Sequence, residues 1–79
     1  MSDLYHHKID ATGLRCPLPI LKAKSALASM NVNEILYIVA TDPAAHKDFE
    51  AMLKHVPHQL VNVLENDGVF EFWIKKGTM

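Results

Sequence analysis

The chain contains one cysteine, Cys16, in the segment Gly13-Leu14-Arg15-Cys16-Pro17-Leu18-Pro19. Gly13 allows a tight turn, and Pro17 has the φ angle and the missing N–H that suit the first position of a helix. Cys16 is therefore expected at, or just before, the N-cap of that helix. Unpaired N–H groups and the positive end of the helix dipole favour an anion there. We expect a lowered pKa for the thiol and a nucleophilic thiolate.

The neighbours of Cys16 are expected to shape its loop. Asp10 ends the preceding strand, and its carboxylate is expected to accept N–H bonds in the loop rather than to transfer protons. Pro19 stiffens the start of the helix, where a missing N–H removes no intrahelical bond. Arg15 either turns its guanidinium toward the sulfur or is a solvated surface charge, and both interpretations stay open. The alternative for Cys16 itself is an inert buried thiol, but the flanking glycine and prolines favour a reactive one.

Hydrophobic periodicity and turn signals predict six elements. Strands are expected over residues 4–10, 34–41, 58–65 and 69–76, and helices over residues 17–30 and 43–56, the second capped by Asp42. Asp67-Gly68 predicts a hairpin between the last two strands, which must then be antiparallel. Strands linked by a helix are expected to run parallel. The order β-α-β-α-β-β predicts one α/β domain over residues 1–79, an α+β sandwich with a mixed four-stranded sheet and both helices on one face.

The other face of this sheet is expected to carry Trp73, because strand alternation places it opposite Phe70, Phe72 and Ile74. Two helices cannot cover both faces. Trp73, with Val61, Val63 and Val69, is therefore expected to form an exposed apolar patch that contacts another protein. If that face is covered, Trp73 belongs to the core.

Composition excludes several classes of function. A hydrophobic content of 49% argues against disorder, and a formal net charge of −1 without a basic run argues against non-specific nucleic-acid binding. No apolar stretch approaches the ~20 residues of a membrane span, and the polar start of the chain is not a signal peptide. A single cysteine forms neither an internal disulfide nor a cysteine-rich zinc site, so we expect a protein of the reducing cytoplasm.

Histidines and lysines give weaker signals. The five histidines, His6, His7, His46, His55 and His58, lack metal-ligand spacing, so neither a metal nor another cofactor is expected. Four lysines are either a basic patch for an acidic partner or ordinary surface charge: Lys47, Lys54, Lys75 and Lys76.

The segment Asp10-Ala11-Thr12-Gly13-Leu14-Arg15-Cys16-Pro17-Leu18-Pro19 resembles the D-x-x-G-x-x-C-P-x-P signature, with its CPxP motif, of the TusA/SirA-like sulfurtransferases. That family has a two-layer α/β sandwich of the predicted element order. The resemblance covers nearly the whole chain and includes Asp42-Pro43-Ala44, Asp48-Phe49, His58-Gln59-Leu60 and Ile74-Lys75-Lys76-Gly77. Three positions depart from the family pattern, and they bear on the identity of the partner: Leu18, His46-Lys47 and Pro57-His58.

The resemblance implies a small sulfur carrier whose cysteine accepts sulfane sulfur as a persulfide and passes it on. Cys16 would be the nucleophile, and Asp10, Gly13, Pro17 and Pro19 would shape its loop. The implied protein is a monomer without a cofactor that acts as a sulfurtransferase, with no direct contact to nucleic acid or membrane.

Its donor would be a cysteine desulfurase or a rhodanese-like protein. The acceptor pathway stays open among tRNA thiolation, molybdenum cofactor maturation and dissimilatory sulfur metabolism. The alternatives are a non-catalytic regulatory or redox-sensing module of the same fold, and a selenium carrier.

Overall fold

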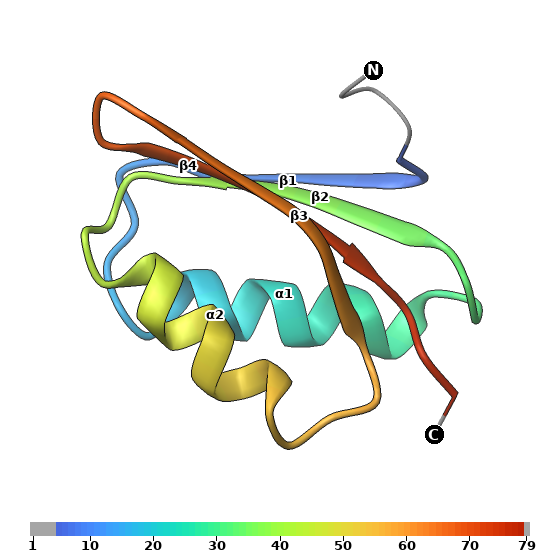
Figure 1. Ribbon diagram of the computed structural model, residues 1–79. Helices are drawn as coiled ribbons and strands as arrows, with labels where there is room; N and C mark the ends of the chain where they lie inside the picture. Colours follow the sequence, from blue (N-terminus) through green and yellow to red (C-terminus); the bar gives the residue numbers. More distant parts are fainter. Residues whose placement is uncertain (1–4, 79) are drawn as a thin grey trace.

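The structure, a computed structural model, describes residues 5–78. Its elements follow the predicted order and are β1 (His7–Ala11), α1 (Leu18–Ser29), β2 (Ile35–Ala40), α2 (Ala45–Leu53), β3 (Gln59–Asn66) and β4 (Val69–Lys75). The four strands form one sheet in the order β1-β2-β4-β3. Both helices lie on the same side of this sheet (Figure 1). The predicted two-layer α/β architecture is therefore confirmed.

Strand directions place the loops that matter for the site. β1 and β2 pair in parallel, with Ala11 opposite Ala40 at their carboxyl ends. β4 is antiparallel to both β2 and β3, so β3 runs in the same direction as β2 although β4 separates them. The expected directions are thus confirmed. Because β1 and β2 end side by side, the loops that follow them are neighbours.

The boundaries of the first two elements differ from the prediction. β1 extends through Ala11, which is fully buried and pairs with Ala40. Residue 4, the predicted first residue of this strand, lies outside the described residues. α1 begins at Leu18, and Pro17 is its N-cap rather than its first residue. Cys16 therefore lies just before the N-cap.

α2 also begins later than predicted, and its N-cap is Ala44 rather than Asp42. Pro43 and Ala44 form a turn, in which the amide of Ala45 donates to the main-chain oxygen of Asp42 at 2.9 Å. The helix starts after this turn, at Ala45, and ends at Leu53, before Pro57. The predicted hairpin is present, with positive φ angles of 52° at Asp67 and 82° at Gly68. Two such residues match the type I′ turn that Asp-Gly favours.

The core fills the space between the helices and the sheet. Phe49 of α2 stacks on Phe72 of β4, with 4.5 Å between ring centroids. Pro19 is fully buried, whereas Ile20, the next residue of α1, is partly buried. The core contains Ala11, Ala23, Leu27, Met30, Leu36, Ile38, Ala40, Ala45, Phe49, Phe70, Phe72 and Ile74.

A bulge in β3 changes which of its side chains reach the core. Leu60 pairs with Ile74, but the next pair joins Asn62 to Trp73, so Val61 is an extra residue. One extra residue reverses the alternation of every side chain that follows. Val63 therefore packs against the core instead of joining Trp73, and the prediction for Val63 is wrong.

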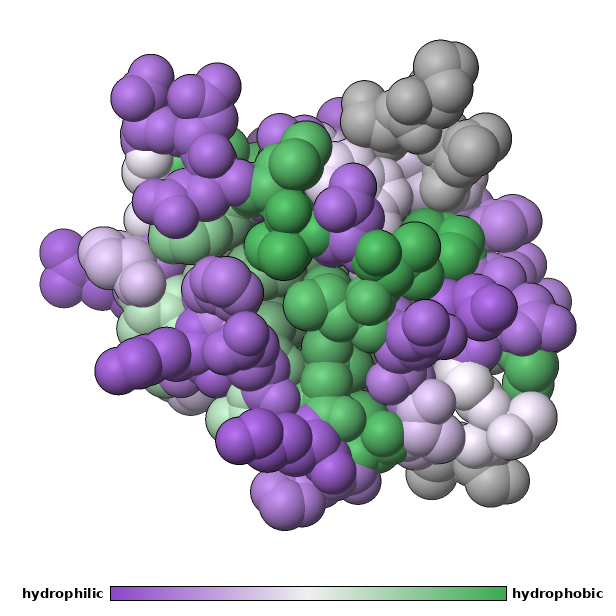
Figure 2. Space-filling view, viewed as in Figure 1, coloured by the Kyte–Doolittle hydropathy of each residue, from purple (hydrophilic) through white to green (hydrophobic). Residues whose placement is uncertain are grey.

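Trp73 lies on the sheet face away from the helices, as predicted, but it is only 4% exposed. Its ring lies 5.0 Å from that of Tyr37, which in turn stacks on Tyr5 at 5.1 Å. The expected exposed patch centred on Trp73 is therefore absent from the described residues. Apolar surface lies elsewhere, and Figure 2 shows a band of hydrophobic side chains across the face seen in Figure 1. The exposed large hydrophobic residues include Leu18, Leu21, Val32, Val61, Leu64 and Val69.

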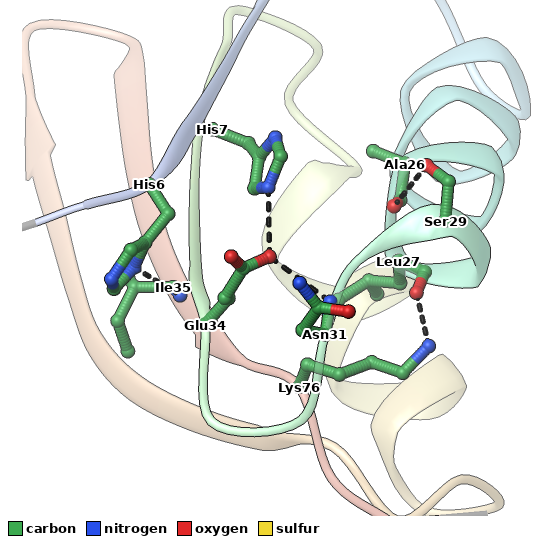
Figure 3. Close-up of polar contacts among 9 residues, drawn as sticks. All are labelled: His6, His7, Ala26, Leu27, Ser29, Asn31, Glu34, Ile35 and Lys76. Carbon is green, nitrogen blue, oxygen red and sulfur yellow. Dashed lines mark hydrogen bonds and ion pairs between the residues drawn. The ribbon is translucent and has the colours of Figure 1, made fainter.

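Polar contacts close the C-terminal end of α1 (Figure 3). The buried ammonium of Lys76 donates to the carbonyl oxygen of Leu27 in the last turn of the helix. A Glu34 oxygen accepts a hydrogen bond from the amide of Asn31 at 3.0 Å and pairs with His7 Nε2 at 2.9 Å. Lys76 is thus turned inward and does not belong to a basic surface patch.

Candidate functional site

The loops after β1 and β2 are joined by two hydrogen bonds. The amide of Gly13 donates to the hydroxyl oxygen of Thr41 at 2.9 Å. The amide of Cys16 donates to Asp42 Oδ2 at 2.6 Å. Residues that are 26 and 28 positions apart in the chain are thereby held together. The position of Cys16 is consequently set by both loops.

Local bonds also shape the loop that precedes Cys16. Asp10 Oδ1 accepts from the amide of Thr12 at 3.0 Å and from its hydroxyl at 2.7 Å. These two bonds hold the pKa of the Asp10 carboxyl below its usual range. Gly13 has a φ of 79°, a left-handed conformation that glycine adopts readily and that fits the expected tight turn. Asp10 therefore makes the loop contacts expected of it.

Cys16 is an exposed free thiol. Its pKa is raised above the ordinary value, chiefly by a side-chain hydrogen bond with the Asp48 carboxylate. Partial desolvation and the negative charges of Asp48 and Asp42 raise this pKa further. The sequence-based expectation of a lowered pKa is therefore wrong. In the free protein, the site favours the protonated thiol.

The two prolines explain why the helix terminus does not stabilise a thiolate. Pro17 and Pro19 have no N–H, and the amide of Leu18 between them already donates to the oxygen of Arg15 at 2.8 Å. Anion binding at a helix start depends on free N–H groups. The same residues that indicate a helix start thus remove two of its donors. The nearby negative charges of Asp42 and Asp48 then decide the direction of the shift.

Arg15 lies at the rim of a pocket and is exposed. It is not among the groups that shift the thiol pKa. The pocket has a volume of about 540 Å³ and is lined by Gly13, Leu14, Arg15, Thr41, Asp42 and Pro43. Pro17 and Pro19 lie on the opposite flank of Cys16, at the start of α1.

Three of the histidines have hydrogen-bond or ion-pair partners other than Cys16 and its loop. His6 Nδ1 accepts from the amide of Ile35 at 3.0 Å, and His46 pairs with Glu50 on α2 at 3.3 Å. His58 Nδ1 accepts from the amide of Gly77 at 3.0 Å. Within residues 5–78, no three histidine, cysteine, aspartate or glutamate side chains gather as metal ligands would. No helix in that part of the chain is long and apolar enough to span a membrane.

Three residues of the site were not predicted to contact Cys16 or its loop: Thr41, Asp42 and Asp48. Asp42 was expected only as a helix cap, and Asp48 was noted only as part of the resemblance. The parallel pairing of β1 and β2 is the signal that would have found Thr41 and Asp42, because it brings their loops together. Asp48 lies one helical turn after Ala44, on the side that faces the thiol.

Comparisons with known proteins identify the family of this chain. Residues 7–76 match the family described as Sulfurtransferase TusA. The sulfur carrier protein TusA of Allochromatium vinosum is 44% identical over 72 residues, which cover 91% of this chain and 95% of that protein. The crystal structure of a SirA-like protein from Desulfitobacterium hafniense superposes with a TM-score of 0.79 at 29% identity, covering 92% of this chain and 100% of that one. This chain therefore belongs to the TusA family of sulfurtransferases.

Proposed function

We propose that the protein is a sulfur carrier that holds sulfane sulfur as a persulfide on Cys16. The observation that carries this proposal is an exposed thiol held between two loops that are hydrogen-bonded to each other. A partner protein can reach such a thiol, and the similarity to the Allochromatium vinosum sulfur carrier supports the same role here.

Loading is a thiol exchange that needs no oxidant. The Cys16 thiolate attacks the outer sulfur of a donor protein's persulfide, a new S–S bond forms, and the donor's S–S bond breaks. The donor cysteine leaves as a thiolate and takes up the proton that Cys16 released. Delivery repeats this step, with an acceptor thiolate attacking the outer sulfur on Cys16.

Because the thiol pKa is raised, we infer that Cys16 must be deprotonated with the help of a partner before it can accept sulfur. Asp48 and Asp42 keep the free thiol protonated, so Cys16 loses its proton when a docked partner changes the local charge. Redox-sensing cysteines have the opposite property, a low pKa that makes them react without a partner. The raised pKa of Cys16 is thus unlike that of a typical redox-sensing cysteine.

The surrounding residues support the cysteine rather than react. Asp10, Gly13, Pro17 and Pro19 shape the loop and the start of α1, and Arg15 contacts the docked partner from the rim of the pocket. The proposed carrier is a single-domain monomer of the reducing cytoplasm without a resident cofactor. Its partners are a donor such as a cysteine desulfurase or a rhodanese-like protein, and a downstream acceptor protein.

The test is intact-protein mass spectrometry after incubation with cysteine and a catalytic amount of a desulfurase. We expect the wild-type protein to gain the mass of one sulfur atom, and a reductant to remove it. Cys16→Ser should gain none and keep its fold, because the exposed side chain contributes little packing. A sulfur gain in Cys16→Ser, or none in the wild type with several donors, would contradict the proposal.

A further inference from the structure

Asp42 lies at the junction of the two loops and uses both of its carboxylate oxygens. Oδ2 accepts from the amide of Cys16 at 2.6 Å, and Oδ1 accepts from the amide of Ala44 at 3.1 Å. The first bond reaches across to the cysteine loop, and the second lies at the start of α2. One side chain therefore connects the nucleophile to the helix that carries Asp48.

The second bond continues directly to Asp48. Ala44 donates its amide to Asp42, and its carbonyl oxygen accepts from the amide of Asp48 at 3.0 Å. Asp48 is the residue whose side chain lies beside the Cys16 sulfur. The carboxylate of Asp42 is thus bonded directly to the main chain of Cys16, and through Ala44 it is connected to the main chain of Asp48.

On the cysteine side, the neighbouring main chain forms its own turns. The amide of Leu14 donates to the oxygen of Ala11 at 3.2 Å, and a turn from Arg15 to Leu18 spans Cys16, whose backbone is also restricted by the proline that follows it. The amide of Cys16 has its acceptor in Asp42. A short bond to a charged acceptor is among the stronger hydrogen bonds in proteins, so it fixes where the cysteine stands.

We propose that Asp42 is a positioning residue for sulfur transfer, because its bond to the Cys16 amide sets the placement of the thiol against Asp48. The inference rests on the proposed function and names a residue that acts through Cys16 without touching the transferred sulfur. The competing explanation is that Asp42 only closes the turn before α2, through its bond to the Ala44 amide.

Asp42→Asn separates these explanations. An asparagine forms this kind of turn contact, with the amide two residues on, about as well as an aspartate does, so the bond to Ala44 is retained. It has one side-chain oxygen instead of two, so its amide group faces the Cys16 N–H and the bond across the loops is lost. The charge near the thiol is lost as well. Thermal unfolding checks that the variant remains folded.

Two readouts need no sulfur donor. The first is the pH profile of Cys16 alkylation by iodoacetamide, which should move to lower pH. At neutral pH the rate should rise about two- to fivefold, the size expected for removing one charge a few ångströms away in water. The second is the amide proton resonance of Cys16, which should move upfield when the charged acceptor is lost.

The third readout is the rate of persulfide transfer from a loaded desulfurase, which should fall about tenfold because a displaced nucleophile attacks poorly. Faster alkylation with slower transfer is the combination expected of a positioning residue. Asp67→Asn, at the β3–β4 hairpin, is the matched control and should behave as the wild type in all three measurements.

The inference is overturned if Asp42→Asn keeps the wild-type alkylation profile, amide resonance and transfer rate. It is also overturned if transfer stays normal while alkylation accelerates, since placement would then not matter. If the wild type itself accepts no sulfur, the proposed function fails, whereas the first two readouts still decide whether Asp42 holds Cys16.

Discussion

The two ends of α1 differ in how the charged groups beside them are placed relative to the helix dipole. At the C-terminal end, the Lys76 ammonium binds the Leu27 carbonyl, so a cation meets the negative end of the helix dipole. At the N-terminal end, the two prolines remove two N–H donors, and Cys16 lies beside carboxylates. The Lys76 cation is stabilised by the helix dipole at the C-terminal end. At the N-terminal end, the nearby carboxylates disfavour a Cys16 thiolate.

We expect the C-terminal end of α1 to contribute mainly to the stability of the protein and the N-terminal end mainly to the reactivity of Cys16. The contacts at the Lys76 end satisfy buried groups, and their loss should unfold the protein more easily. The contacts at the Cys16 end hold an exposed thiol in its protonated form, and their loss should mainly change its chemistry. Three variants test this division.

Lys76→Met should have the largest effect on stability. It leaves the Leu27 carbonyl without its charged donor, and we expect a loss of about 1.5–3 kcal/mol in the free energy of unfolding. Urea denaturation measures this loss. Lys75→Met is the matched control on the neighbouring residue and should change little.

A second measurement on Lys76→Met follows His58, whose pKa is lowered by burial and by the charge of Lys76. Removing that charge should raise the His58 pKa toward its ordinary value in an NMR titration. Alkylation of Cys16 should stay as in the wild type. A changed alkylation rate would show that the two ends of α1 are coupled and that the comparison is wrong.

Gly13→Val should have an intermediate effect. Because no atom lies within 4 Å of the position that a Cβ would take, the cost arises from the positive φ of 79° and not from a clash. A β-branched residue in this conformation should cost about 1–2 kcal/mol, and Gly13→Asn should cost less. Thermal unfolding of the two variants gives the comparison. Equal stability of the two variants would mean that the loop can adopt another conformation at Gly13 without a cost in free energy.

Asp48→Asn should have the smallest effect on stability and a clear effect on the thiol. Loss of an acidic residue in the first turn of α2 should cost about 0.3–1 kcal/mol. The pKa of Cys16 should fall, so alkylation at neutral pH should become faster. Glu50→Gln, which removes a charge from another face of the same helix, should leave the alkylation rate unchanged.

The pH dependence of stability gives a further check on Asp48. Because the folded-state pKa of Cys16 is raised, the folded protein binds this proton more tightly than the unfolded chain does. The resulting stability is present below the unfolded-state pKa of the thiol and is lost as the pH rises through the folded-state value. The wild type should therefore lose more stability than Asp48→Asn across this alkaline range. Parallel curves for the two proteins would contradict the role assigned to Asp48.

Local sequence signals determined the elements, their order and the identity of the exposed cysteine. Gly13 and Asp67-Gly68 mark turns because few residues accept positive φ, and the hydrophobic runs of β2 and β4 require burial. The double-layer arrangement follows, since two one-sided helices and one sheet bury their apolar faces together in few ways. These properties depend on residues close together in the chain.

Only the tertiary structure decided the charge around Cys16 and the side on which Val63 lies. Asp42 and Asp48 reach the cysteine loop because parallel pairing brings together segments far apart in the chain. The bulge at Val61 reverses the alternation of the side chains of β3 between the two sheet faces, and no local sequence pattern predicts it. Both features depend on contacts between distant segments. The pairing of β1 with β2 determines which charges surround the Cys16 thiol, and the extra residue Val61 determines which side chains of β3 face the core.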